Sequence, residues 1–204
     1  MKKEEKDLLR LKDILDGIGF EFFLVQGTLL GAVRDGTLIG YDKDFDLGTF
    51  EDLEDPSVRF TLEEALTDEG LKCTIRGPER NPRYSKYWAL IEGLKWQTAL
   101  LPCKTNGDTV SMSTSPLRYP AALFAETLDY DFLGTQFLVP YPPEDWLEFN
   151  YGPTWRIHAQ RVTIMKGSDP IKIFNSSMVE KVYLKCTEEG VPVSPLESIG
   201  PQLD

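Results

Sequence analysis

The chain has 204 residues, 41% of them hydrophobic and 27% charged, a composition typical of a folded domain with an ordinary core, with or without an appendage. The net charge of −11 excludes a general binder of nucleic acids or anionic membranes, because such proteins need a broad excess of Lys and Arg. The charged N-terminus lacks an apolar signal region and no stretch approaches a membrane span, so we expect a soluble, cytoplasmic protein.

Cysteine and histidine are scarce in the chain. Cys73, Cys103 and Cys186 are widely separated and odd in number, which favours reduced thiols over a disulfide framework. His158 is the only histidine, so the parts of a Cys/His zinc site or a serine–histidine triad are missing. Carboxylates and cations are therefore the groups to examine for chemistry.

The first fifty residues predict two helices and two strands in close succession. Leucines at three- and four-residue steps predict an amphipathic helix over residues 4–18, and the apolar run 20–25 predicts a core strand. A tight turn at Gly27-Thr28 should then lead into a short helix over 29–34. Residues 42–50 complete this part of the chain as an acidic strand.

The middle of the chain predicts mainly strands. A helix over 57–69 and a strand over 71–75 precede a loop over 76–86 that is broken by Gly and Pro. Further strands are expected at 87–91, 94–101, 109–113, 130–132 and 136–139, with hairpin turns at 105–108 and 133–135.

The C-terminal part predicts helices and a loose tail. Early proline and acids in Pro142–Asp145 indicate a helix start, and Ser177 with Glu180 forms a capping box that opens another helix. These patterns predict a main domain over residues 1–165, a helical extension over 166–187 and a flexible tail over 188–204.

Three acids at every second position are the most informative feature. On an extended strand, Asp42, Asp44 and Asp46 point to one face, with Asp44 and Asp46 about 7 Å apart at their Cα atoms, so their carboxylates can converge on one ion. Phe45 and Leu47 then face the core. Carboxylates with an open side suit a hard cation such as Mg²⁺ in phosphoryl chemistry.

A solvated acidic turn remains an alternative from the residues alone. A calcium loop of the EF-hand type is excluded, because Leu47 and Leu53 occupy the positions that need glycine and a bidentate glutamate.

Several residues near the acids could bind phosphate. Glycine at Gly27 allows close approach, and the Gly27-Thr28 turn before a helix would aim backbone N–H groups at an anion. Arg34 could contact phosphate or pair with an acid. The 76–86 loop carries Arg80, Arg83 and Lys86, and is either a phosphate-binding loop or an exposed loop with scattered charge.

These motifs resemble the LicD and fukutin-related family. The family signature, GTLLGAVRDG followed by an aromatic residue and D-x-D-x-D, matches Gly27–Gly36, Tyr41 and the three acids. Its closing pattern is similar to PEDWLE at 143–148, Tyr151-Gly152 and Trp155, so the resemblance extends over residues 8–157. It implies an α/β (α+β) fold of the nucleotidyltransferase type, with a small mixed sheet flanked by helices.

The resemblance also implies an activity. We expect transfer of phosphocholine or ribitol phosphate from a CDP-linked donor to a glycan or small hydroxyl acceptor, with CMP as the leaving group. Mg²⁺, or alternatively Mn²⁺, would be held by Asp44 and Asp46, while Asp42 adds a metal contact or takes the acceptor proton. Gly27, Thr28, Arg34 and the cations of the 76–86 loop would bind the donor phosphates.

One position departs from the family. The family has a further acid on a later strand, and the segment that fits best here, Leu94–Leu100, has Gln97 at that place. Two alternatives to the transfer of a phospho-alcohol therefore remain: transfer of a nucleotide to a small molecule, and a non-catalytic relative that binds nucleotide or glycan.

Overall fold

The computed structural model describes residues 1–40, 42–77, 87–113, 117–153 and 155–156, and the strands at 162–166, 169–173 and 193–195. The chain divides into two compact units, Met1–Trp146 and Leu147–Asp204. The division falls within helix α4 (Pro143–Tyr151), earlier than the boundary at residue 165 that the sequence predicts.

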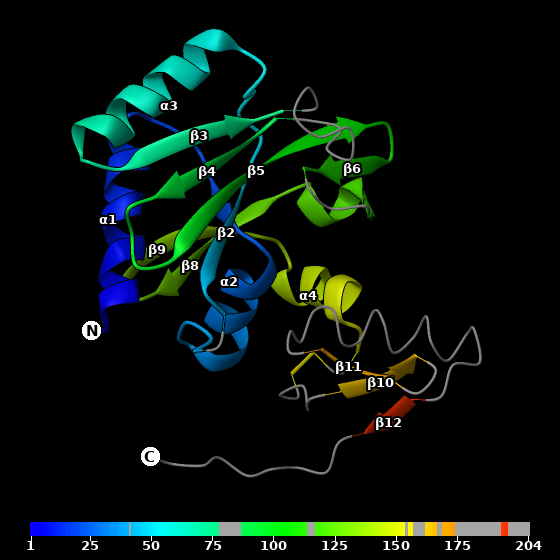
Figure 1. Ribbon diagram of the computed structural model, residues 1–204. Coiled ribbons are helices and arrows are strands. Elements are labelled where there is room, and N and C mark those ends of the chain that lie inside the picture. Colours follow the sequence, from blue (N-terminus) through cyan, green and yellow to red (C-terminus); the bar gives the residue numbers. More distant parts are fainter. Residues whose placement is uncertain are drawn as a thin grey trace. The chain divides into compact units, whose positions relative to one another are not determined.

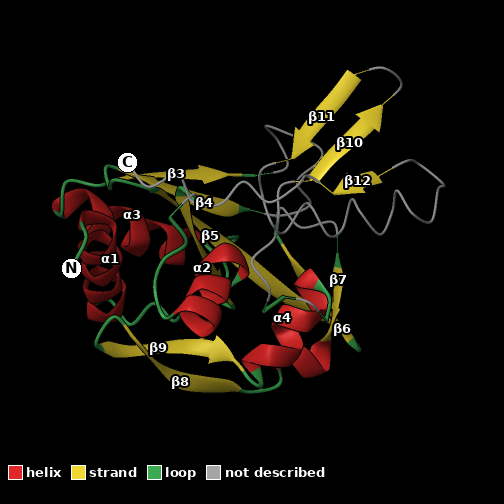
Figure 2. Cartoon of the chain, turned by 90° about the horizontal axis from the view of Figure 1, so that it is seen from below, coloured by secondary structure: helices red, strands yellow, loops and turns green. Residues whose placement is uncertain are grey.

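The first unit is built on one mixed sheet of nine strands. Its main path runs in the order β3-β4-β5-β2-β1-β9-β8, β6 pairs with β5, and β7 pairs with β6. The pairs β2/β5 and β1/β9 are parallel and the others are antiparallel, with the β8–β9 hairpin at the opposite edge from β3 (Figure 2). The strands are β1 (Phe23–Leu24), β2 (Asp44–Thr49), β3 (Lys72–Arg76), β4 (Trp88–Glu92), β5 (Gln97–Asn106), β6 (Thr109–Met112), β7 (Arg118–Pro120), β8 (Thr127–Phe132) and β9 (Thr135–Pro140).

Helices α1 (Lys3–Gly17) and α3 (Pro56–Asp68) lie side by side along the β3–β4 edge (Figure 1). The leucine stripe of α1 is completely buried, as its spacing predicts. Asp55 caps α3 by accepting a hydrogen bond from the Ser57 backbone N–H, and Pro56 occupies the first turn, where its missing N–H costs nothing. Local sequence signals therefore place both helices correctly.

The sheet has a core face and an open face. On β2, Phe45 and Leu47 are fully buried, while Asp44 is exposed and Asp46 is half-buried. The first residues of the neighbouring strand β5 repeat the pattern, with Thr98 and Leu100 buried, Gln97 exposed and Ala99 partly exposed. The alternation predicted from the acidic strand is thus confirmed, and the acids stand on the open face.

The second unit contains the three-stranded antiparallel sheet β11-β10-β12, formed by Val162–Lys166 (β10), Asp169–Ile173 (β11) and Val193–Pro195 (β12). Strand β11 lies within residues 166–187, for which the sequence predicts a helical extension. The helix expected from Ser177 lies outside the described residues, as does the predicted tail apart from β12.

Two further expectations can be compared with the described part of the chain. Cys73 and Cys103 are free thiols, whereas Cys186 lies outside it. None of the helices described there combines the length and apolar character that a membrane span requires.

Candidate functional site

The start of helix α2 (Gln26–Leu30) is hydrogen-bonded to strand β2 at Asp46. The Val25 backbone N–H donates to the Asp46 carbonyl oxygen at 3.2 Å, and the Asp46 backbone N–H donates to Thr28 Oγ1 at 3.0 Å. Thr28 is 3% exposed, so this hydroxyl bond is shielded from water. The main chain of Asp46 is therefore held through both its N–H and its carbonyl by residues at the start of α2, which include Thr28 of the predicted phosphate-binding turn.

Helix α2 begins earlier than the sequence predicts. The expected helix starts at Leu29 after a Gly27-Thr28 turn, whereas the observed helix starts at Gln26 and continues into a π-helical turn (Gly31–Asp35). Gly27 and Thr28 thus belong to the first helical turn. The sharp change of direction occurs one residue earlier, at Gln26, whose φ of +48° lies in the left-handed region.

Asp42 lies directly against Gly27. A Cβ atom at Gly27 would stand 1.9 Å from Asp42 Oδ2, so only a residue without a side chain allows this approach. Asp42 precedes β2, which begins at Asp44, and therefore does not share the strand that its spacing predicts. Its side chain is hydrogen-bonded with that of Asp44, so it still belongs to the acid cluster.

The three acids repel one another. Burial, the hydrogen bond with Asp44 and the charges of Asp44 and Asp46 together raise the pKa of Asp42 to about 8. Burial and the charge of Asp44 raise the pKa of Asp46 to about 7. Protons thus compensate part of the negative charge near neutral pH, and a cation could take their place.

The donor set suits a hard cation but does not form a closed cage. Within the described ranges, no three His, Cys, Asp or Glu side chains are grouped so that they could hold a metal ion together. Mg²⁺ needs only one or two carboxylates and takes its other ligands from water and substrate phosphate. The all-oxygen donors of Asp44 and Asp46, with the exposed side of Asp44 open to solvent, fit that requirement.

Gln97 stands beside Asp44 on the sheet. The parallel register pairs Asp44 with Gln97 and Asp46 with Ala99, and paired residues of neighbouring strands point to the same face. Gln97 is exposed on that face. The position that corresponds to a family acid is therefore adjacent to Asp44, and it carries a neutral amide.

The predicted phosphate-binding cations have different outcomes. Arg34 is 4% exposed at its side chain and makes a two-pronged ion pair with Asp35, in which Nε and Nη2 each donate at 2.8 Å. This pairing is the structural alternative that the sequence left open. Arg80, Arg83 and Lys86 lie outside the described residues.

Lys43, between the first two acids, has contacts that the sequence does not predict. Its Nζ donates to the Gly40 carbonyl oxygen at 2.8 Å and lies 5.5 Å from the centre of the Trp96 ring. Both contacts steady the segment that carries Asp42. The Asp-Lys-Asp sequence alone does not predict the contact with Trp96, because the pairing of β2 with β5 brings Trp96 near Lys43.

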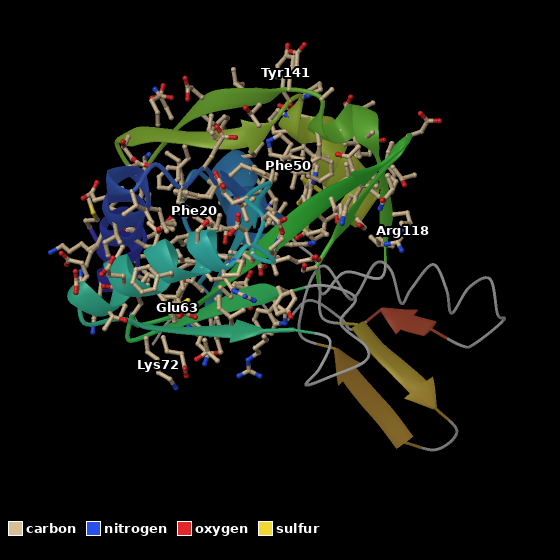
Figure 3. The ribbon with its side chains drawn as sticks, turned by 90° about the horizontal axis from the view of Figure 1, so that it is seen from above. Phe20, Phe50, Glu63, Lys72, Arg118 and Tyr141 are labelled. Carbon is tan, nitrogen blue, oxygen red and sulfur yellow. The ribbon has the colours of Figure 1, made fainter. Side chains whose placement is uncertain are left out.

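Two cavities of the first unit lie away from the acids. One of about 270 Å³ lies beyond the end of β2, between residues 50–54 and 102–105, and Phe50 on its wall is labelled in Figure 3. Another of about 390 Å³ is lined by parts of α1, β8 and β9. Neither includes Asp42, Asp44 or Asp46, so the open face of the sheet is the better candidate site.

Comparison with known proteins identifies similar sequences. The LicD/FKTN/FKRP nucleotidyltransferase domain matches residues 19–141. Ribitol-5-phosphate transferase FKTN of Mus musculus is 28% identical over 168 residues, and that of Homo sapiens is 29% identical over 162 residues. Each match covers 76% of this chain but 34% of the relative, so the chain spans about a third of their length.

Solved structures agree on the fold. The solution structure of the antibiotic-resistance factor ANT(2'')-Ia has a TM-score of 0.50 and 13% sequence identity, over 91% of this chain and 84% of that one. The crystal structure of ANT(2'')-Ia with adenylyl-2''-tobramycin also gives 0.50 and 13%, over 93% and 91%. At this identity the likeness shows the fold alone, a mixed sheet flanked by helices of the nucleotidyltransferase type.

Proposed function

Because the chain belongs to the LicD/FKTN/FKRP family, we propose that it is a Mg²⁺-dependent phosphotransferase that moves a phospho-alcohol from a CDP-linked donor to a glycan hydroxyl. The phospho-alcohol is of the ribitol phosphate or phosphocholine type. Two relatives named as ribitol-5-phosphate transferases support the first of these.

The observation that carries the proposal is the gathering of three carboxylates beside the first turn of α2. Asp46 is fastened to Thr28, and Asp42 lies against Gly27. Burial and the charges of the neighbouring acids raise the pKa values of Asp42 and Asp46, as expected where carboxylates are gathered at a functional site. In a solvated acidic turn, the carboxylates would have no reason to be buried or to pack against a glycine such as Gly27.

Each residue has a proposed part in donor binding. Asp44 and Asp46 would hold the cation, whose chemistry when bound is to neutralise the donor diphosphate and the charge that builds in transfer. Gly27 and Thr28 would orient the donor through their backbone, since the Thr28 hydroxyl already accepts the Asp46 N–H. Arg34 would not contact the donor phosphates directly, because its guanidinium forms an ion pair with Asp35.

The transfer itself needs a proton acceptor. The acceptor oxygen forms a bond to the phosphorus that carries the alcohol, and the bond from that phosphorus to the CMP oxygen breaks. The hydroxyl proton must leave, and we assign this role to Asp42, the acid outside the strand pair. Gln97 cannot take the proton, because an amide is not a base at neutral pH.

The test is a titration of the protein with CDP-ribitol and CDP-choline, with and without Mg²⁺, together with measurement of CMP release. The wild type should bind a donor in a Mg²⁺-dependent way and release CMP with a suitable acceptor, whereas Asp44→Asn/Asp46→Asn should do neither. Nucleotide found attached to the acceptor would instead indicate nucleotide transfer. If the wild type and the double variant bound the CDP-linked donors equally well, with or without Mg²⁺, the result would contradict the proposal.

Gln97 favours a second candidate, a non-catalytic relative that binds nucleotide or glycan. It places a neutral amide next to Asp44, where a further acid would strengthen cation binding. This candidate predicts binding of the CDP-linked donor without CMP release for every acceptor tested. Release of CMP by the wild type would exclude it.

A further inference from the structure

Gln26 has a backbone conformation that its residue type does not favour. Its φ is +48°, and Leu133, in the β8–β9 hairpin turn, is the other non-glycine residue with positive φ in the described part of the chain. A left-handed conformation is strained for a residue with a Cβ atom and persists only where its surroundings impose it. Gln26 stands between Val25 and Thr28, the two residues that hold the main chain of Asp46.

The Gln26 side chain is tethered to a distant part of the sheet. Its Nε2 donates to the Tyr119 hydroxyl at 3.3 Å across 93 residues of sequence. Tyr119 of β7 is fully buried, lies parallel to the Trp146 ring with centres 5.9 Å apart, and meets the Phe124 ring edge to face at 5.7 Å. The anchor is therefore rigid, and it reaches the residue whose backbone is strained.

We propose that Gln26 is a positioning residue for the acidic site, held in its left-handed conformation by the Tyr119 hydroxyl. The sharp turn at Gln26 allows Val25 and Thr28 to bind the same residue, Asp46, and brings Gly27 against Asp42. Without the tether, the strained residue can relax toward ordinary backbone angles, and Gly27 then moves relative to the acids. The role of the site in cation binding rests on the proposed function.

The experiment compares Tyr119→Phe, Gln26→Gly and the double variant with the wild type. Tyr119→Phe removes the hydroxyl and keeps the ring, while Gln26→Gly removes the tether and accepts positive φ without strain. Tyr141→Phe, at a tyrosine that is 47% exposed and labelled in Figure 3, is the matched control. Hydrogen–deuterium exchange of residues 25–30 and titration with Mn²⁺ alone are measured for each protein.

Tyr119→Phe should exchange faster at residues 25–30, with exchange in α1 and β5 unchanged, and its Mn²⁺ dissociation constant should rise about two- to tenfold, the range expected for one net hydrogen bond. Gln26→Gly keeps positive φ without strain, so it should stay closer to the wild type in both measurements. The double variant should behave like Gln26→Gly, because a glycine at position 26 no longer needs the Tyr119 hydroxyl. The Tyr141→Phe control should behave like the wild type.

Unchanged exchange at residues 25–30 in Tyr119→Phe would overturn the proposal, as would additive losses of Mn²⁺ affinity in the double variant. The exchange measurement does not depend on the reaction, so it decides the positioning role by itself. A wild type that binds Mn²⁺ but releases no CMP would count against the proposed function only.

Discussion

Replacing Gly27 by alanine should separate the stability of this protein from its cation binding. The new Cβ atom would lie 1.9 Å from Asp42 Oδ2, and that distance must grow to at least 3.0 Å. The backbone at Gly27 is not in the positive-φ region, so the helix accepts alanine and the Asp42 carboxylate must move. The substitution therefore acts on the acid cluster rather than on the fold.

The two expected effects have opposite signs. Alanine favours a helix by up to about 1 kcal/mol relative to glycine, and withdrawal of Asp42 relieves repulsion among the acids, so stability without cation should hold or rise slightly. Moving one carboxylate by about 1 Å, from roughly 5 to 6 Å from a divalent ion, loses about 1 kcal/mol at an effective dielectric constant near 20. This corresponds to a roughly sixfold higher dissociation constant.

Urea unfolding and Mn²⁺ titration at pH 7.5 measure the two effects on the same samples. Gly17→Ala is the matched control, because Gly17 also lies in a helix and a Cβ atom there would meet nothing within 4 Å. It should keep the Mn²⁺ affinity of the wild type. Wild-type affinity in Gly27→Ala would refute the reasoning, because the contact between Asp42 and Gly27 would then be irrelevant to the site.

Three further predictions follow from the same contacts. The folded-state pKa values of Asp42 and Asp46 are about 8 and about 7, above their ordinary value of 3.8. Both acids therefore stabilise the fold at low pH, and this stability is lost between about pH 4 and pH 8. The loss is of the order of 2 kcal/mol after solvent screening. Urea unfolding at pH 5 and pH 8 without divalent ions measures this loss of stability. Added Mg²⁺ should stabilise the protein more at pH 8 than at pH 5. Equal stability at the two pH values without divalent ions would contradict the raised pKa values of Asp42 and Asp46. Thr28→Val leaves the shielded Asp46 N–H without its acceptor and should lower the free energy of unfolding by about 1–3 kcal/mol. Thr28→Ser keeps the hydroxyl and should keep most of the wild-type stability. Equal losses in the two variants would show that the hydroxyl is not the cause. Gln97→Asp adds a carboxylate beside Asp44 and should strengthen Mn²⁺ binding by about tenfold or more in a direct titration, while unchanged affinity would mean that the β5 position does not face the cation.

The sequence by itself determined the features that depend on near neighbours. The period-two alternation around Asp44 and Asp46 predicted a strand with buried Phe45 and Leu47, and the structure has that strand. Leucine spacing predicted α1, and turn residues predicted the hairpin after Asn106. These patterns work because side-chain direction and turn geometry are set within a few residues.

Only the tertiary structure decided how distant segments meet at the acids. The approach of Asp42 to Gly27, the register of Asp44 with Gln97 and the bond from Gln26 to Tyr119 all depend on which strands and helices become neighbours. The short strand β7 had too few residues for a periodic signal, whereas β1 lies within the core strand predicted over residues 20–25. The sequence thus identified the acids, and long-range packing determined the contacts that raise their pKa values and hold them together.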